Sequence, residues 1–208
     1  MVALTGAAQA ALVSRPGGMI YDTTQNITWL ANLNVNGLMD WNTATDWANN
    51  LVYGGYDDWR LPTLNPSDTS CSFYFYPWVN GFSYQHYGVN CTGGELSHLF
   101  VTDLGNKAYE SVLNQAGDTA EQIANLALFS NVQSYFYWSG TEYAPDPSNA
   151  WYFLTDNGDQ FYFYKSAALY AVAVRPGDVA AAVPEPQTLA LALLALGATV
   201  VARRRRPA

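Results

Sequence analysis

Residues 150–165 read AWYFLTDNGDQFYFYK, and this stretch decides the fold class of the chain. Two apolar, aromatic-rich runs flank Asp156-Asn157-Gly158-Asp159, and Asn-Gly between such runs is a strong signal for a β-hairpin. Asn and Gly are favoured there because both central residues of a type I′ turn need positive φ. The stretch therefore predicts two antiparallel strands, Ala150–Thr155 and Gln160–Lys165, joined by a type I′ turn.

Shorter strands are predicted on both sides of this hairpin. Two apolar runs, 19–21 and 27–30, are separated by turn-forming residues and predict a second hairpin near the N-terminus. The aromatic run 135–138 and the apolar run 169–174 predict two further strands. Residues 59–62 are expected to form a short extended segment that ends at a proline.

Two helices precede most of the strands. Residues 41–51 carry apolar side chains at i, i+3 and i+4 spacing, with Asp40 or Asn42 as the N-cap and glycines after the last turn. Residues 95–104 repeat this spacing, and a shorter helix is expected near 121–128. Two short helices together with a small antiparallel sheet predict an α+β domain.

Composition sets the class of protein and excludes one class of partner. The chain has 208 residues, with 15% aromatic and 12% charged residues, so it has enough apolar surface for one folded domain. Residues 11–183 hold 16 acidic and 5 basic side chains, which leaves 11 net negative charges. Such a body repels a phosphate backbone, and we expect no nucleic-acid partner.

The C-terminus has three parts in a fixed order. Pro184, Glu185 and Pro186 form an extended, accessible segment, because proline breaks helices. The uncharged run 188–202 follows and predicts a single transmembrane helix. This helix is short for a bilayer, but snorkelling side chains and local thinning of the bilayer offset the difference. The positive charge after it fixes that end in the cytoplasm and the body outside. The charge comes from Arg203, Arg204, Arg205 and Arg206.

This tail resembles the PEP-CTERM sorting signal of Gram-negative bacteria that make extracellular polysaccharide. The resemblance implies an exosortase as partner, an inner-membrane anchor before processing, and then a place at the cell surface or in the extracellular matrix. Residues 179–187 would be the linker and 203–208 the basic cytoplasmic tail. At the other end, residues 1–10 contain Ala8-Gln9-Ala10, a signal-peptidase pattern that predicts the remnant of a signal peptide, with the true start upstream.

Cys71 and Cys91 lie near the two ends of residues 64–93, a segment rich in Pro, Ser, Asn, Gly and aromatic residues. In an exported protein such a pair favours a disulfide, with two buried free thiols as the alternative. We interpret 64–93 as a long loop pinned by this disulfide. The histidines, His86 and His98, do not stand at metal-binding spacing from the cysteines, so no metal site is expected.

Several phrases of the body resemble the Lcl C-terminal domain family, a group of extracytoplasmic domains related to the C-type-lectin-like fold. These phrases include GYDDWRLPT at 55–63, YWSGTE at 137–142 and VAVRPG at 172–177, and the most distinctive parts are WRLPT at 59–63 and VRPG at 174–177. The resemblance implies a C-type-lectin-like domain over residues 11–178, a surface or adhesion role, and polysaccharide binding in some members. Residues 64–93 are an insertion relative to simpler relatives, and ligand behaviour around them does not carry over.

Candidate binding residues gather in the insertion. Aromatic rings stack on the apolar faces of sugars, and surface loops carry function. The alternative is that half of these aromatics pack the loop as its own small core. The residues that we single out as a ligand surface are Tyr76, Trp78, Tyr84 and Tyr87.

Structural ion pairs are expected at two of the body's arginines. Arg60 is expected to pair with a carboxylate such as Glu142, and Arg175 with another acid at a strand end. Both pairs are interpreted as holding the domain together rather than as contacting a ligand.

Patterns for catalysis and metal binding are weak. Ser139 lacks the Gly-x-Ser-x-Gly context of a nucleophile elbow, and neither histidine has evident triad partners. Glu142 and Asp146 leave a glycosidase pair as an alternative. An EF-hand starting at Asp156 fails because position twelve is Ala167. We expect no enzyme and no cofactor, with calcium elsewhere in so acidic a body as an open alternative.

The sequence favours a non-enzymatic, exported module that binds extracellular polysaccharide. A structural matrix component without a specific ligand is the second hypothesis, and a glycoside hydrolase is the third. A fold alone does not choose among them.

Overall fold

The computed structural model describes residues 12–78 and 81–179 of the chain. The order of elements confirms an α+β domain. The elements are β1 (Leu12–Arg15), β2 (Met19–Asp22), β3 (Ile27–Leu30), α1 (Trp41–Asn49), β4 (Phe73–Phe75), β5 (Gln85–Val89), α2 (Glu95–Ser97), the π-helical turn η1 (His98–Asp103), α3 (Ala120–Leu126), β6 (Phe136–Glu142), β7 (Asn149–Leu154), β8 (Asp159–Tyr164) and β9 (Val174–Pro176).

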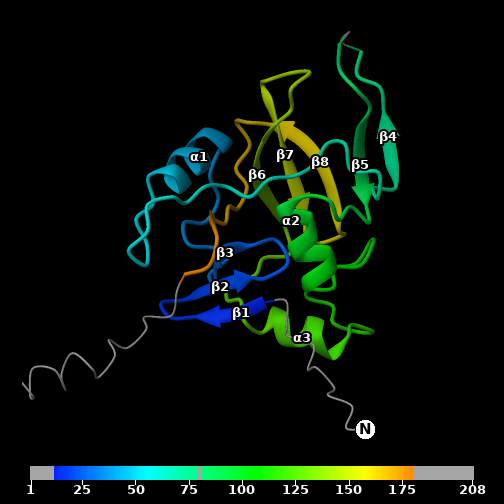
Figure 1. Cartoon of the computed structure of the whole chain (residues 1–208). Helices are drawn as coiled ribbons and strands as arrows, with labels where there is room; N and C mark the ends of the chain where they lie inside the picture. Colours follow the sequence, from blue (N-terminus) through cyan, green and yellow to red (C-terminus); the bar gives the residue numbers. More distant parts are fainter. Residues whose placement is uncertain (1–11, 79–80, 180–208) are drawn as a thin grey trace, which may run out of the picture. The chain divides into compact units, whose positions relative to one another are not determined.

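The strands form two antiparallel sheets (Figure 1). The smaller sheet has the order β1-β2-β3-β9 and the larger one β4-β5-β8-β7-β6. In the smaller sheet Ile27 lies opposite Pro176, so the last strand closes against the first predicted hairpin. That hairpin is confirmed, whereas β1, which pairs along the outer side of β2, was not predicted.

The hairpin that decided the fold class forms, but its turn is not of type I′. Strands β7 and β8 pair from Asn149–Tyr164 to Leu154–Asp159, which leaves a loop of four residues, 155–158. Gly158 alone in this loop has positive φ, at 73°, and its N–H donates to the carbonyl of Leu154 at 2.9 Å. Type I′ needs two adjacent residues with positive φ. The Asn-Gly signal therefore predicted the hairpin correctly and the turn wrongly.

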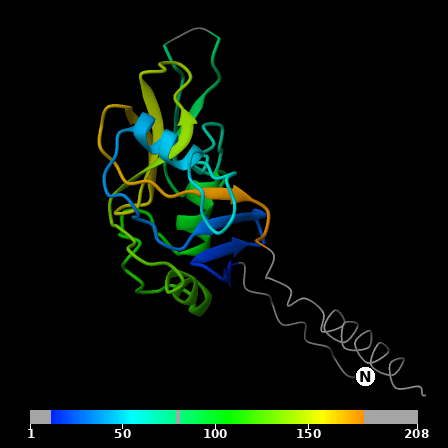
Figure 2. The same cartoon turned by 90° about the vertical axis from the view of Figure 1, so that its left-hand side faces the viewer.

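The core is built from large aromatic side chains on the larger sheet. All six residues of β7 are buried, and Trp138 and Trp151 are fully enclosed. Phe100 of η1 stacks on Phe153, with ring centroids 5.4 Å apart, so this helical turn covers one face of β7. Helix α1 lies over the larger sheet (Figure 2), and it buries only Ala44 and Ala48, whose small side chains allow close approach.

The interpretation of residues 64–93 as a loop is wrong in its central part. Strands β4 and β5 form a hairpin there, and β5 pairs with β8 through Gly88–Gln160 and Val89–Asp159. The side-chain amide of Gln160 donates to the carbonyl of His86 at 3.2 Å. The insertion therefore extends the larger sheet by two strands, on the edge opposite to β6 (Figure 1).

Several predicted segments lie outside the described residues. They are the signal-peptide remnant 1–10, most of the linker 179–187 with Pro184, Glu185 and Pro186, the membrane helix 188–202, and the tail 203–208 with Arg203 to Arg206. Within 12–78 and 81–179, no helix has the length and apolar character needed to span a bilayer.

Arg60 forms the expected ion pair, but its partner is Glu95 and not Glu142. Its guanidinium makes a two-pronged contact with that carboxylate, at 2.7 and 2.6 Å. The Glu95 carboxylate also accepts from the N–H of Thr63 at 2.8 Å. Glu142 instead pairs with Lys165. The difference arises because Glu95 opens α2 directly beside the extended segment that carries Arg60, which sequence spacing does not show.

Arg175 pairs with an acid at a strand end, as expected. Its guanidinium contacts both carboxylate oxygens of Asp58, at 2.7 and 3.0 Å, and lies 3.9 Å from the ring centre of Tyr56. Residues 55–63 thus supply both the carboxylate and the ring that contact Arg175 of β9.

The first prediction separates the two glutamates. Glu95→Gln is expected to lower the free energy of unfolding by about 2 kcal/mol, because it leaves the half-buried Arg60 without a charge partner. Glu142→Gln is the matched control and should cost less than about 1 kcal/mol, since the Glu142 side chain is 45% exposed whereas that of Glu95 is 18% exposed. Urea unfolding of both variants measures the difference. Equal effects of the two substitutions would contradict the central role given to Glu95.

Candidate functional site

The hairpin β4–β5 directs its aromatic side chains to two faces by strand alternation. Tyr74 lies opposite His86, and residues two apart share a face, so Tyr74, Tyr76 and Tyr84 lie on the same side. Tyr74 and Tyr76 each make an edge-on contact with Tyr84, with ring centroids 5.3 Å apart in both pairs. These three rings are more than half exposed, and Trp78 near the tip is fully exposed.

We call Tyr74, Tyr76, Trp78 and Tyr84 the aromatic hairpin surface. Three of its four members were predicted from the sequence as a ligand surface. Tyr74 was not singled out, although period-2 alternation would have identified it once residues 73–75 were recognised as a strand. These four rings form a surface that stands away from the core. Packing in the core does not account for them, and exposed apolar patches of this kind commonly mark interaction sites.

Tyr87, the fourth predicted residue, does not belong to this surface. It lies on the other side of the hairpin and packs against Phe75 and Phe161, with ring centroids 5.6 and 5.0 Å apart. Phe75 also contacts Tyr162 at 6.0 Å. These inward rings fix the hairpin to β8, so the alternative of a small aromatic core is correct for one face of the insertion and wrong for the other.

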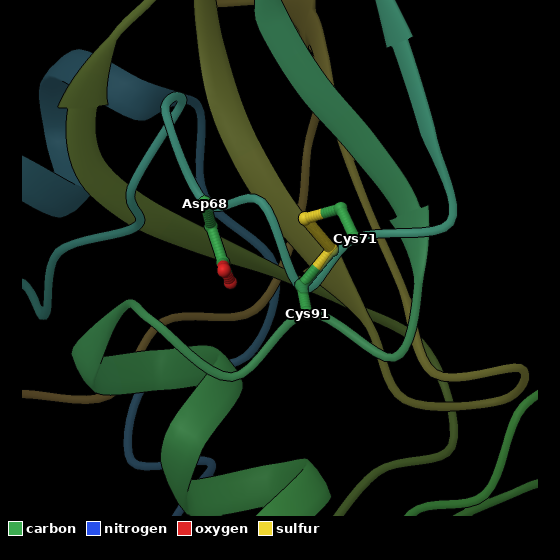
Figure 3. A group of neighbouring side chains, drawn as sticks. All are labelled: Asp68, Cys71 and Cys91. Carbon is green, nitrogen blue, oxygen red and sulfur yellow. A yellow bond between two sulfur atoms is a disulfide. The ribbon is translucent and has the colours of Figure 1, made fainter.

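The base of the hairpin is closed by the Cys71–Cys91 disulfide, as predicted (Figure 3). The carboxylate of Asp68 lies beside it and accepts from the backbone N–H groups of Ser70, Thr92 and Gly93, at 2.9, 2.8 and 2.6 Å. Burial alone would raise the pKa of Asp68, but these hydrogen bonds outweigh it and lower the pKa.

Asp68, Cys71 and Cys91 have the residue types of a metal site, and their ligand atoms lie within 4.8 Å of one another. Both sulfurs are bonded to each other, and the carboxylate already accepts hydrogen bonds from Ser70, Thr92 and Gly93. A disulfide sulfur is not the thiolate that binds zinc. The cluster therefore acts as a structural clamp on the two ends of the insertion.

A separate acidic pocket of about 300 Å³ lies between η1 and α3. Asp103 is 5% exposed there, and its Oδ2 has no hydrogen-bond partner. Burial, with added repulsion from Asp22 and Glu121, raises the pKa of Asp103 to about 7. His98 lies 3.8 Å from the other oxygen. No local sequence pattern predicts this pocket, because its lining residues come from segments far apart in the chain.

The residues considered for catalysis are engaged in structural contacts. The Ser139 hydroxyl donates to the carbonyl of Trp151 at 2.7 Å inside the sheet. The Asp146 carboxylate accepts from Ser148 and Asn149, which stabilises the turn before β7. The hydrogen bonds from Ser148 lower the pKa of Asp146. Glu142 is held by Lys165.

The comparison with known families concerns the C-terminus. Residues 182–206 match the model of the PEP-CTERM protein-sorting motif. The PEP-CTERM motif marks the chain as an exported protein that an exosortase processes at the membrane. The predictions of the sorting signal and of this partner are thereby confirmed. No curated protein matches the chain. The identity of the body as an Lcl C-terminal-like domain stays a prediction.

The second prediction concerns the disulfide at the base of the hairpin. Replacing both Cys71 and Cys91 by Ser should lower the free energy of unfolding by about 3 kcal/mol. The cross-link joins residues 20 apart in the sequence and so restricts the unfolded chain. Treatment of the native protein with a reductant should give the same loss in a thermal melt. Unchanged melting after verified reduction would show that the clamp contributes nothing.

The third prediction uses the raised pKa of Asp103. An unfolded aspartate ionises near pH 4, whereas the folded carboxyl of Asp103 ionises at about 7. The contribution of Asp103 to the free energy of unfolding is therefore largest below pH 4, falls as the pH rises to 7, and then stays constant. Between pH 4 and 7 the free energy of unfolding should fall by roughly 2–4 kcal/mol less in Asp103→Asn than in the native protein. Chemical unfolding measured from pH 4 to 8 tests this.

The control for this pH series is Asp57→Asn. Asp57 is exposed, and the fall in stability assigned to Asp103 should persist in this variant. A fall in stability between pH 4 and 7 that persists in full after Asp103→Asn would assign it to other groups.

Proposed function

We propose that the domain is a non-enzymatic binding module for extracellular polysaccharide, displayed outside the cytoplasm by its sorting signal. The observation that carries the proposal is the aromatic hairpin surface. Four large rings project from one edge of the larger sheet, and Trp78 has its whole side chain in solvent. Aromatic side chains offer large, rigid contact area at a low cost in conformational entropy. Rings of this kind suit the apolar faces of sugars.

The way in which the rings are held supports a binding role. The disulfide clamps the base of the hairpin, and the inward face packs on β8 through Tyr87 and Phe161. A surface that is already ordered loses less entropy when a ligand binds. A structural matrix component without a ligand would have no need to keep such rings exposed and ordered together.

Charge narrows the class of polysaccharide. The body between residues 11 and 183 carries 16 acidic and 5 basic side chains. Such a surface repels strongly acidic polymers, which disfavours uronic-acid-rich or sulfated chains. A neutral or basic polysaccharide fits better. The sorting signal supports an extracellular polysaccharide as ligand, since it resembles that of proteins from bacteria that make extracellular polysaccharide, but it does not bear on the charge of the polymer.

The body itself is proposed to be an Lcl C-terminal-like domain with a C-type-lectin-like fold. Support comes from the phrases at 55–63, 137–142 and 172–177, which lie at the Arg60 and Arg175 ion pairs and on β6. The insertion then adds a strand pair to this scaffold. Calcium is not part of the proposal, and binding should not change when calcium is chelated.

A glycoside hydrolase is the third hypothesis. It needs two carboxylates placed on either side of a scissile bond, whereas Glu142 and Asp146 each hold a local structural contact. Turnover of a glycoside panel that Glu142→Gln abolishes would favour it over binding alone.

The fourth prediction tests the aromatic hairpin surface. Trp78→Ala should weaken binding of the mature domain to the producing cell's own polysaccharide about tenfold, since exposed aromatic anchors dominate binding energy. Its effect on thermal stability should be small, because the ring has no buried contacts. Pull-down and calorimetric titration measure the two quantities.

The matched control is Tyr135→Ala. Tyr135 is 42% exposed and precedes β6, at the opposite edge of the same sheet from the hairpin. Its replacement should leave binding intact. Equal losses in both variants, or no binding of the native domain to any self-produced polysaccharide, would favour the structural matrix component instead.

A further inference from the structure

A second aromatic site lies where the insertion meets the body. A pocket of about 280 Å³ opens between β4, β5 and the β7–β8 turn. Its walls include Phe73, Tyr87 and Phe161, with Tyr109 at the side and Asn157 and Asp159 as polar groups. This volume lies just below the roughly 300–1,000 Å³ of pockets that hold drug-sized ligands. The pocket therefore suits one small ring rather than a polymer segment.

The carboxylate of Asp159 is the uncompensated charge of this pocket. No hydrogen bond or ion pair reaches it from the described residues. Burial, with repulsion from Asp156, raises the pKa of Asp159 to about 6, so the group is ionised at pH 7. It is half-buried beside aromatic rings, where an unpaired negative charge is costly.

The part of the chain that the structure describes has no unpaired lysine or arginine for Asp159. Within residues 12–78 and 81–179, each lysine and arginine is already in an ion pair with another acid. Lys107, whose backbone carbonyl lies against Gly158 of the neighbouring turn, pairs with Asp118. The described residues therefore supply no positive group that neutralises Asp159, and an external cation can take that place.

Tyr109 adds an independent sign of function. Its φ is 64°, in the left-handed region that costs a side chain with a Cβ roughly 1–2 kcal/mol. A hydrogen bond of 2.7 Å from its N–H to the carbonyl of Asn157 holds this conformation. The ring is nevertheless 71% exposed, so core packing does not explain it. Strain of this kind in an exposed residue commonly marks a binding site.

We propose that this pocket binds one amino-bearing sugar ring of the polysaccharide, with the protonated amine on the Asp159 carboxylate and the apolar face of the ring against the aromatic wall. This inference rests on the proposed function and names the chemistry of its ligand. The carboxylate supplies a charge-assisted hydrogen bond. Tyr109, Tyr87 and the phenylalanines place electron-rich faces around the cation.

The pocket also complements the aromatic hairpin surface. Both are carried by the same two strands, with Phe73 and Tyr87 on one face of the hairpin and Tyr74 on the other. A polymer that passes round the edge strand β4 can contact the exposed rings on one face of the hairpin while one of its units enters the pocket on the other. The exposed surface would then supply affinity for sugars in general, and the pocket would select for the amine.

The test compares two soluble probes at pH 7, a tetramer of glucosamine and a tetramer of N-acetylglucosamine. Titration of the mature domain should show a preference for the free amine of about tenfold or more, the range expected of a charge-assisted hydrogen bond. Asp159→Asn should remove that preference while leaving the weaker binding of the acetylated probe. Asp156→Asn is the matched control, since Asp156 is exposed outside the wall, and it should retain the preference.

Tyr109→Gly is the second variant, and folding does not confound it. Glycine accepts the left-handed φ, so the melting temperature should stay the same or rise. Loss of the ring should nevertheless weaken binding of the glucosamine tetramer about 2- to 30-fold, the range of a cation–π contact. A melting temperature that falls with no change in affinity would show a structural role only and overturn the assignment of Tyr109.

Failure of this inference is distinct from failure of the proposed function. Equal affinity for the two tetramers, no affinity for either while the native polysaccharide binds through Trp78, or tighter capture of a lysine-rich peptide would each overturn the amino-sugar site. None of these results touches the Trp78→Ala comparison. Absence of all polysaccharide binding would instead remove the proposed function.

Discussion

The two-pronged contact between Arg60 and Glu95 joins the segments on which the rest of the structure depends. Arg60 exchanges both backbone hydrogen bonds with Val174, each of 2.8 Å, and so ties the extended segment to β9 and the smaller sheet. Glu95 opens α2, and its carbonyl accepts from the side chain of Gln25 at 3.3 Å. One partly buried ion pair thus connects the first hairpin, the last strand and the central helical turn. The hydrogen bonds from Arg60 and Thr63 outweigh burial and lower the pKa of Glu95, which keeps the pair charged.

The insertion at residues 64–93 extends the edge of the larger sheet next to the Arg60–Glu95 pair. Residues 64–93 leave the body directly after the Arg60 segment and return to it directly before Glu95. Both ends of the insertion are therefore fixed by the same ion pair, and the disulfide fixes them a second time. An edge strand with exposed backbone groups invites pairing with other chains. Here β5 covers β8, and the exposed rings move outward to β4 and the hairpin tip.

Local signals in the sequence predicted the elements that depend on local chemistry. The β7–β8 hairpin, α1 and the helical turn after Glu95 all follow from spacing and capping, and the sorting signal follows from the order of its three parts. The partner of Arg60 and the acidic pocket at Asp103 did not follow, because both join residues far apart in the chain. Strand β4 was missed since three aromatic residues between Ser72 and Tyr76 do not show alternation of polar and apolar residues. The turn type was wrong because tertiary pairing of Tyr109 with Asn157 competes with the local preference of Asn-Gly.

The distribution of charge gives the binding proposals their direction. The body has five basic side chains, and each is committed to one carboxylate: Arg15 to Asp178, Arg60 to Glu95, Lys107 to Asp118, Lys165 to Glu142 and Arg175 to Asp58. The remaining acids have no lysine or arginine partner among the described residues. Most of them lie in water, where ionisation costs little. Asp103 and Asp159 are partly or fully buried, and burial raises the pKa of each. Asp103 lies among other acids, where a proton suffices to neutralise it. Asp159 lies among aromatic rings open to solvent, where an external cation with an apolar body is the better match. We therefore interpret the pocket at Asp103 as a pH-sensitive structural feature and the pocket at Asp159 as a ligand site.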